Sequence, residues 1–238
     1  MTKHMNLRWL TAFSLGAIGA GVMAFQINCA AASYDPAVGF SGTSNPNGAW
    51  SYGSSSSLGG TFTLGLNHPQ YLLALGLYAW NSDPTASIAY NPTSSAIAYT
   101  GPTDNVVWAP HQISLQPGPT SFSQIRFGVP QSGEYEVKGS YRSVDQYYGA
   151  STDVHILRNG ASIFDGAING KTDVSNFNQT LELGAGDYLD FAVGKGNYGY
   201  GWDSTGLQVQ ITMIPEPATA SLLLLGLGFL GWVRKGSQ

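Results

Sequence analysis

Polar and apolar residues alternate along the middle of the chain, and a period of two is the pattern of half-buried β-strands. In residues 134–141 the alternation places Tyr135, Val137 and Tyr141 on one face, with charged or polar groups on the other. No stretch of residues 33–214 keeps the apolar period of a helix over three turns. The pattern therefore predicts strands joined by turns.

The clearest local signal is a β-hairpin. Two apolar runs, Val154–Leu157 and Ser162–Phe164, are separated by a segment that contains Asn159 and Gly160. Both residues adopt positive φ readily, as a two-residue type I′ turn requires. The pattern predicts a hairpin at this position.

Further strands are expected between clusters of glycine and proline, which favour turns. They are residues 49–52, 60–64, 106–108, 112–115, 122–129, 177–183, 188–193 and 207–214, with 71–80 as a further candidate. Many short strands at this spacing predict an all-β fold, a jelly-roll-like antiparallel β-sandwich. The residues expected to be buried in its core are Val137, Ile156, Phe164, Leu183, Phe191 and Val193.

The first 32 residues have the pattern of a secretory signal peptide. Lys3 and Arg8 precede a largely apolar stretch at 9–27, and small residues follow it at 30–32. We therefore expect export and cleavage by signal peptidase after Ala32. The alternative is a retained membrane anchor, which the glycines and polar residues within the stretch disfavour.

The C-terminal segment 215–238 carries three elements in a fixed order. They are the tripeptide Pro215, Glu216 and Pro217, the apolar run 218–233, and the basic residues Arg234 and Lys235. In order and type they resemble the PEP-CTERM sorting signal of Gram-negative bacteria. The resemblance implies an exosortase as processing partner, and a place at the cell surface or in the extracellular matrix.

The apolar run 218–233 is expected to form a short hydrophobic helix. Sixteen residues at 1.5 Å rise would extend over roughly 24 Å, slightly less than a hydrocarbon core of about 30 Å. Such a transmembrane helix would hold the chain in the membrane before processing, and removal of the tail would leave none. The alternative is a permanent C-terminal anchor.

Residues 33–214 form the expected β-sandwich domain, and the resemblance extends over most of it. The segments that carry it are 45–53, 108–110, 117–119, 132–137, 152–160, 186–194 and 203–207. They are similar to the pattern of a broad group of PEP-CTERM exported proteins. This resemblance implies a cellular location and a fold, but it implies no enzymatic activity.

Composition narrows the classes of partner. Residues 33–214 contain six Lys and Arg against thirteen Asp and Glu, and this negative charge repels phosphate backbones, so we expect no nucleic acid. Cys29 is the only cysteine, and cleavage after Ala32 would remove it, so we expect no disulfide or thiol chemistry. All 13 tyrosines lie in residues 33–214, as suits an extracellular β domain.

Sequence signals for catalysis are weak. Residues 194–199 match the glycine spacing of dinucleotide sites, but the residues after them do not open a helix that would hold a pyrophosphate. Gly-x-Ser-x-Gly and His-Glu-x-x-His motifs are absent, and the histidines of the domain, His68, His111 and His155, are widely spaced. We expect a non-enzymatic protein with no catalytic residue and no required cofactor.

Strand order suggests a candidate binding site. If consecutive strands run antiparallel from residue 122 onward, the loops 145–149, 166–175 and 194–204 emerge at one end of the sandwich. Sugars bind through rings that stack on their C–H faces and polar groups that hydrogen-bond their hydroxyls. The candidate residues are Tyr147, Tyr148, Tyr198, Tyr200, Trp202, Asp145 and Asp203, with Asn169, Asp173 and Asn197 beside them.

These features predict a non-catalytic exported surface or matrix protein that binds exopolysaccharide at this rim. Two alternatives are a secreted carbohydrate-active hydrolase with an unrecognised carboxylate site, and a structural matrix protein whose loops only cover the core. Ca²⁺ is a further alternative ligand, at Asp190 and the segment 203–205, although no Asp-x-Asp-x-Asp loop is present to support it. No residue is assigned as a metal ligand.

Overall fold

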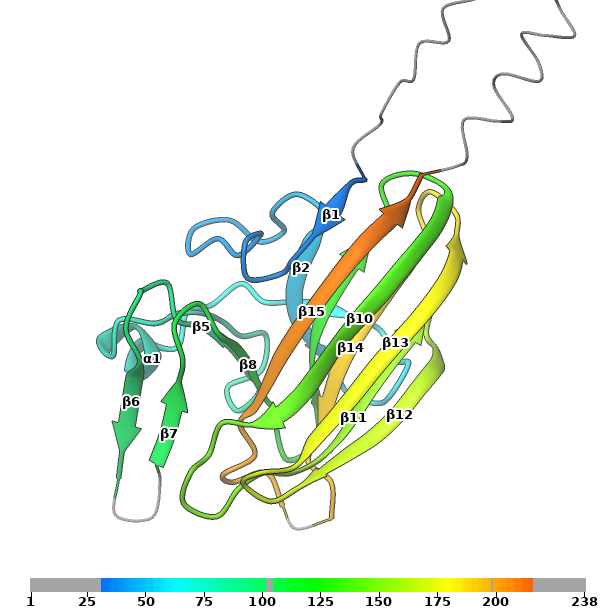
Figure 1. Ribbon diagram of the computed structural model, residues 1–238. Coiled ribbons are helices and arrows are strands. Elements are labelled where there is room, and N and C mark those ends of the chain that lie inside the picture. The colour runs from blue at the N-terminus through cyan, green and yellow to red at the C-terminus, as the bar shows by residue number, and fades with distance from the viewer. Residues whose placement is uncertain (1–30, 102–104, 198, 216–238) are drawn as a thin grey trace, which may run out of the picture. The chain divides into compact units, whose positions relative to one another are not determined.

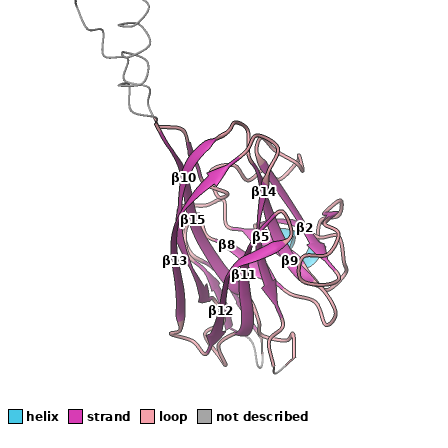
Figure 2. Ribbon diagram, turned by 90° about the vertical axis from the view of Figure 1, so that its right-hand side faces the viewer, coloured by secondary structure: helices cyan, strands magenta, loops and turns pink. Residues whose placement is uncertain are grey.

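The computed structural model describes residues 31–101, 105–197 and 199–215, which form two antiparallel β-sheets packed face to face (Figures 1 and 2). The first sheet has seven strands, in the order β13 (Val174–Leu183), β10 (Gly133–Ser143), β15 (Thr205–Ile214), β8 (Ile113–Gln116), β5 (Ser87–Tyr90) and β4 (Tyr78–Trp80), with β1 (Ser33–Tyr34) also paired to β15. The second has six, in the order β12 (Ala161–Asn169), β11 (Ser151–Arg158), β14 (Tyr188–Gly194), β9 (Phe122–Gly128), β2 (Trp50–Ser55) and β3 (Thr63–Leu64).

Two further elements lie outside these sheets. They are a hairpin of β6 (Ile97–Thr100) and β7 (Asn105–Trp108), and the short helix α1 (Gln70–Ala74). None of the described residues forms a helix long and apolar enough to cross a membrane. The predicted signal peptide, except for residues 31 and 32, and the predicted hydrophobic helix lie outside the described residues.

From β8 to β15 the chain crosses repeatedly between the two sheets. Strands β8, β10, β13 and β15 belong to the first sheet, and β9, β11, β12 and β14 belong to the second. All pairings within the sheets are antiparallel. This arrangement is the all-β, jelly-roll-like sandwich that the sequence predicts.

Side chains from both sheets fill the space between them. On β10 the alternation predicted from the sequence is present, because Tyr135, Val137 and Tyr141 are fully buried. Across the core, Phe177 of the first sheet packs against Phe191 of the second, with ring centroids 6.1 Å apart. Each enclosed apolar side chain of this size contributes roughly 1.5–3 kcal/mol through burial.

Buried hydroxyl groups also connect the layers. The Tyr141 hydroxyl donates a hydrogen bond of 2.8 Å to the carbonyl of His155 on β11, in the opposite sheet. The Tyr52 hydroxyl donates to the carbonyl of Pro36 at 2.9 Å. A buried phenol needs such an acceptor, so these bonds fix the positions of both rings.

The predicted hairpin is confirmed as β11 and β12. Arg158 pairs with Ala161, and the two residues between them, Asn159 and Gly160, have φ values of 51° and 85°. Positive φ at both positions is the geometry of a type I′ turn, whose twist matches that of the flanking strands.

Three local expectations were wrong. Residues 71–80 are not one strand: Leu72 is buried from α1, Gly76 at φ 88° follows the helix, and β4 begins only at Tyr78. The expected strand 60–64 is limited to the two residues of β3. Phe164 is half-buried, because β12 is the outermost strand of its sheet, whereas the other five predicted core residues are buried.

Candidate functional site

Three loops meet at one end of the sandwich, the lower end in Figure 1. They connect β10 to β11, β12 to β13 and β14 to β15. The antiparallel registers place the end of β10 beside the starts of β13 and β15, and the start of β11 beside the ends of β12 and β14. We call these the rim loops, residues 144–150, 170–173 and 195–204.

Aromatic side chains cluster on the rim loops. The rings of Tyr147 and Tyr148 meet edge-on with centroids 4.6 Å apart, and Tyr148 meets Trp202 edge-on at 5.1 Å. These three rings and that of Tyr200 are exposed. The structure therefore brings four of the predicted aromatic residues to one surface, while Tyr198 lies outside the described residues.

Trp202 has an unusual backbone conformation. Its φ is 63°, in the left-handed region that bulky side chains rarely adopt. Glycines at 199 and 201 flank the turn, and Gly199 also has a positive φ. The strained conformation holds a large ring outward at the rim, and such strain is typical of functional loops.

Asp145 and Asp203 do not belong to this exposed surface. Both are buried, at 0% and 1% exposure, so neither carboxylate reaches a sugar that lies on the rings. Oδ1 of Asp145 accepts hydrogen bonds from the amides of residues 147–149 at 2.8–3.2 Å. Oδ1 of Asp203 accepts from the amide and hydroxyl of Ser151 at 2.8 and 3.1 Å. The sequence predicted that these two carboxylates would bind sugar hydroxyls. In the structure they hold the rim loops instead.

The remaining polar candidates of the rim have different surroundings. Asn169 and Asn197 line an open hollow on the second sheet, described below. Asp173 is engaged by the backbone, because its two oxygens accept from the amides of Asn169 and Val174 at 2.9 Å. The rim therefore supplies amide side chains, whereas its carboxylates mainly order the loops.

A groove of about 310 Å³ opens beside Trp202, on the outer face of the first sheet. Its floor is formed by β5 and β8, and its walls are α1, the β6–β7 hairpin and the end of the β14–β15 loop. Four exposed rings reach into it from these walls: Tyr71, Tyr99, Tyr200 and Trp202, each 42–60% exposed. We call it the aromatic groove.

Polar groups lie between the rings of the aromatic groove. The floor carries the side chains of Ser87, Ser114 and Gln116. The Gln116 amide donates to the carbonyl of Tyr200 at 2.5 Å, and its oxygen accepts from the Ser204 hydroxyl at 2.7 Å. The floor thus fixes the loop that presents two of the rings.

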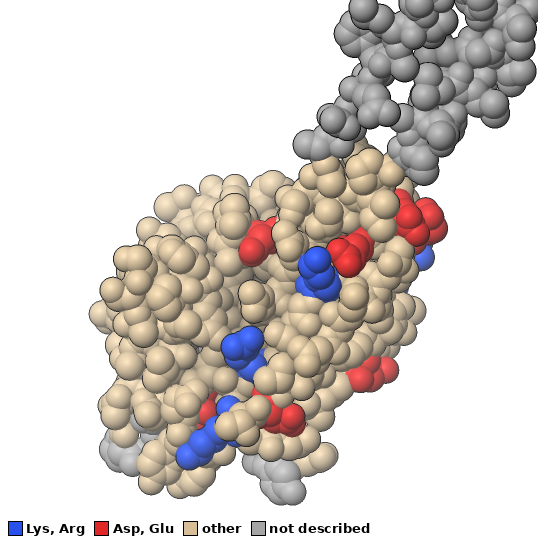
Figure 3. Space-filling model, in the orientation of Figure 1, with Lys and Arg blue, Asp and Glu red and all other residues tan. Residues whose placement is uncertain are grey.

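Charged side chains are sparse around this face. In Figure 3 the surface over α1 and β5 is without Lys, Arg, Asp or Glu, and the residues that line the aromatic groove are all uncharged. Such a lining suits a neutral ligand with apolar faces and hydroxyl groups. The sequence did not indicate Tyr71 or Tyr99, because they precede the loops that strand order brings together.

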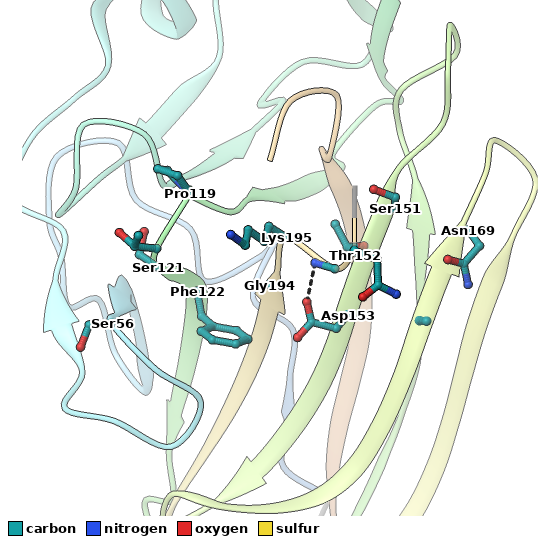
Figure 4. Close-up of a pocket in the computed structure, with 15 residues that line it drawn as sticks. Ser56, Pro119, Ser121, Phe122, Ser151, Thr152, Asp153, Asn169, Gly194 and Lys195 are labelled. Carbon is teal, nitrogen blue, oxygen red and sulfur yellow. Dashed lines mark hydrogen bonds between the residues drawn. The ribbon is translucent and has the colours of Figure 1, made fainter. Parts of the chain in front are cut away.

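A second hollow, of about 610 Å³, lies on the outer face of the second sheet (Figure 4). It is more polar, and Asp153 and Lys195 face it together with Phe122. Oδ1 of Asp153 accepts from the amide of Gly196 at 2.8 Å. We call it the polar hollow, and the β14–β15 loop contributes residues to both cavities.

Beneath the polar hollow, His155 bridges two carboxylates. Its Nε2 lies 2.9 Å from Asp153 and its Nδ1 lies 2.6 Å from Asp165. Burial opposes protonation of the ring, but the hydrogen bonds and negative charges of the two aspartates raise the pKa of His155 above its usual 6.5. His155 is thus a strand histidine whose two ring nitrogens both have carboxylate partners.

The residues that the sequence offered as alternative Ca²⁺ ligands do not lie next to one another in the structure. Asp190 lies on β14 and forms a bidentate ion pair with Arg126 of β9, at 2.7 and 2.8 Å. Asp203 lies at the opposite end of the sandwich, on the rim. Both oxygens of Asp190 are thus engaged by a guanidinium, and this pair does not form a cation site.

Comparison with protein-family models identifies one motif. Residues 214–235 match the PEP-CTERM protein-sorting motif. The chain therefore carries a PEP-CTERM sorting signal, which implies an exported protein that an exosortase processes. Of the matched residues only 214 and 215 are described, so Glu216, Pro217, Arg234 and Lys235 lie outside the described part. No curated protein matches the chain significantly.

Solved structures with a similar arrangement include CBM51 from Clostridium perfringens GH95 in complex with methyl-galactose. It is 16% identical, with 52% of this chain and 86% of that one covered and a TM-score of 0.34. The CBM22-1 xylan-binding domain from Paenibacillus barcinonensis Xyn10C is 12% identical, with 52% and 89% covered and a TM-score of 0.33. Rabbit GITRL is 21% identical, with 40% and 73% covered and a TM-score of 0.29.

Proposed function

We propose that this exported protein binds polysaccharide at the cell surface or in the extracellular matrix, without catalysis, and that the aromatic groove is its binding site. The observation that carries the proposal is the convergence of four exposed rings on one uncharged groove. Three separate parts of the chain supply them: α1, the β6–β7 hairpin and the β14–β15 loop.

The chemistry of the groove suits a sugar chain. The C–H faces of a pyranose stack on aromatic rings, and its hydroxyls exchange hydrogen bonds with polar groups, and this groove combines exposed rings with an uncharged polar lining. Beyond Trp202 the surface continues to Tyr148 and Tyr147 through edge-on contacts. A strip of rings longer than the groove favours a polymer over a single sugar.

The lining of the two cavities supports binding over hydrolysis. Glycoside hydrolysis uses two carboxyl groups on either side of the scissile bond. Among the described residues, Asp153 is the only carboxylate that lines either cavity, and it lies in the polar hollow. Asp153 is engaged by His155 and by the amide of Gly196, which supports a role for it in ordering the hollow over one in catalysis.

Trp202→Ala tests the proposal. The probe is exopolysaccharide isolated from the source organism, and the protein is followed by affinity electrophoresis through a gel that contains it. We expect retention to weaken by about 30-fold or more, because a central aromatic side chain is typical of binding hot spots. The melting temperature should stay within about 2 °C of the parent, because the ring is exposed.

Tyr78→Ala is the matched control. Tyr78 is 44% exposed, close to the 43% of Trp202, but it does not line the aromatic groove. Its loss should leave retention unchanged. Equal retention of the Trp202 variant and the parent would contradict the proposed site, and unfolding of that variant would show that the ring covers the core. Release of reducing ends from the polysaccharide would instead support the hydrolase alternative.

A further inference from the structure

Asp145 and Asp203 both lie just beyond the point where β10 and β15 stop pairing at the rim. The β10–β15 register ends with the pair Ser143 and Thr205, beside which the amide of residue 144 donates a 3.0 Å hydrogen bond to the carbonyl of Ser204. The next residues along the two segments are the two aspartates. Both carboxylates hold the same loop, because Asp145 accepts from the amide of Gly149 and Asp203 accepts from the amide of Ser151, two residues further along the chain.

Each of these carboxylates uses only one of its oxygens. The Oδ1 atoms hold the amides of residues 147–149 and the amide and hydroxyl of Ser151, as described above. Oδ2 of Asp145 and Oδ2 of Asp203 are both buried and have no hydrogen-bond partner. Two acceptor atoms are thus buried at the rim without a hydrogen-bond partner, which costs free energy unless a ligand supplies one.

No charged side chain in the described part of the chain compensates the pair. None of the five ion pairs found there includes Asp145 or Asp203. The lysines of the adjoining rim loops, Lys171 and Lys195, are exposed. Burial, with the added charges of Asp153 and Asp145, raises the pKa of Asp203 to about 6.

We propose that Asp145 and Asp203 bind one Ca²⁺ ion through their unused Oδ2 atoms. A hard divalent cation removes the repulsion between the carboxylates and supplies the missing partner for both oxygens. The described residues contain no group of three His, Cys, Asp or Glu side chains placed to hold a metal. Main-chain carbonyls and water would complete the shell, a ligand mixture that Ca²⁺ accepts and Zn²⁺ does not favour.

The site differs from the Ca²⁺ alternative considered from the sequence, because Asp145 takes the place of Asp190. Its consequence is structural. Asp145 caps the loop that carries Tyr147 and Tyr148, and Asp203 follows Trp202, so one ion would fasten two rim loops to each other. This inference does not depend on the proposed polysaccharide binding, and its test uses no polysaccharide.

Thermal unfolding of the full chain, purified in a mild detergent, tests the proposal. Protein stripped with a chelator is titrated with Ca²⁺ at neutral pH, with ionic strength held constant by NaCl. A ligand that binds only the folded state stabilises it, so we expect the melting temperature to rise by about 5–10 °C at a Ca²⁺ concentration roughly one hundred times Kd. Calorimetry on the parent should give one ion per chain.

The variants Asp203→Asn and Asp145→Asn distinguish the effect of cation binding on stability from the effect of the Oδ1 hydrogen bonds. The asparagine oxygen still accepts the Oδ1 bonds, whereas the buried charge is gone. Without Ca²⁺ each variant should be at least as stable as the parent, because the repulsion is relieved. With Ca²⁺ each should be less stable than the parent, because the ion no longer binds. Asp173→Asn is the control, since its carboxylate lies on a rim loop and should leave the Ca²⁺ response unchanged.

Three results would overturn the proposal. The first is a parent protein whose melting temperature and calorimetry do not respond to Ca²⁺. The second is an Asp203→Asn variant that responds as the parent does. The third is a parent that Mg²⁺ or added NaCl stabilises as much as Ca²⁺ does, which would mean that only a general ionic effect acts on the rim. If both variants fail to fold, calorimetry on the parent decides.

Discussion

At the scale of single residues, His155 shows how a charged group is tolerated under a surface hollow. The ring is 11% exposed and lies between Asp153 and Asp165. The same contacts lower the pKa of both aspartates: for Asp153 they outweigh the opposing effect of burial, and for Asp165 the hydrogen bond from Ser162 contributes most. The three groups therefore stabilise one another's charged forms.

We expect the contribution of His155 to stability to depend on pH. Because its folded pKa is raised, the contribution should be complete below the unfolded value of 6.5 and should be lost as the pH rises through the folded value. Asp153 and Asp165 set the lower limit of the pH range. Their contribution to stability is lost as the pH falls through their folded pKa values, which lie below 3.8. The advantage of the parent over His155→Gln should therefore be largest between these limits.

Urea unfolding of the parent and of His155→Gln across this range measures that dependence. A stability difference that stayed constant from pH 4 to 9 would contradict a protonated His155. Asp190→Asn serves as a comparison, because the ion-pair partner of Asp190 is an arginine and not a histidine, so the cost of that substitution should change little from pH 5 to 9.

The sequence predicted the type of the rim residues better than their exposure. Strand order placed Tyr147, Tyr148, Tyr200 and Trp202 at one end, because antiparallel connections fix which loops share a rim. Burial of Asp145 was not predictable, since a carboxylate in a loop is usually solvated. Its burial follows from three backbone amides that converge on it, a contact that depends on the loop conformation.

At the scale of elements, the β11–β12 hairpin depends on its turn. Gly160 has a φ of 85°, and a Cβ at this position would lie 3.4 Å from the carbonyl oxygen of Gly59. We expect Gly160→Val to destabilise the domain by about 1–2 kcal/mol, because a β-branched residue is strained at positive φ. This corresponds to a fall of about 3–6 °C in the melting temperature.

Gly128→Val is the matched control for the hairpin. Gly128 lies in β9, is exposed, and a Cβ there would make only an ordinary contact of 3.8 Å. Calorimetric melting of the two variants should therefore separate the effect of positive φ from the effect of added volume. A Gly160 variant that melted with the Gly128 variant would contradict the type I′ turn.

Strands with a clean two-residue alternation were the ones that the sequence predicted well. The long strands β10 and β15 have one buried face and one exposed face over much of their length, so their pattern is regular, whereas β11 was found from the turn that follows it. The region 56–104 was predicted poorly, because its elements are short and their burial depends on packing around Leu72, Leu77 and Trp108. Half of the aromatic groove comes from this region, so its ring set could not be predicted either.

At the scale of the whole molecule, the segment that carries the sorting signal is separate from the sandwich that carries the candidate binding site. The sandwich extends from β1 at Ser33 to β15 at Ile214, and Ser33 pairs with Thr212 of β15. The sorting motif covers residues 214–235 and so begins where β15 ends. Processing close to the tripeptide would leave every strand of the two sheets intact.

The expected product of export is therefore a chain that has lost both terminal segments. Mass spectrometry of protein recovered from the surface of the native host should find an N-terminus at Ser33 and no peptide from residues 222–238. Replacing Pro215, Glu216 and Pro217 by alanine should leave the tail attached, because the tripeptide is the part of the signal that an exosortase is expected to read. The N-terminus at Ser33 should be unaffected in this variant, since signal peptidase acts on the other end. An intact tail on the unaltered protein at the surface would contradict removal and would leave the motif acting as an anchor.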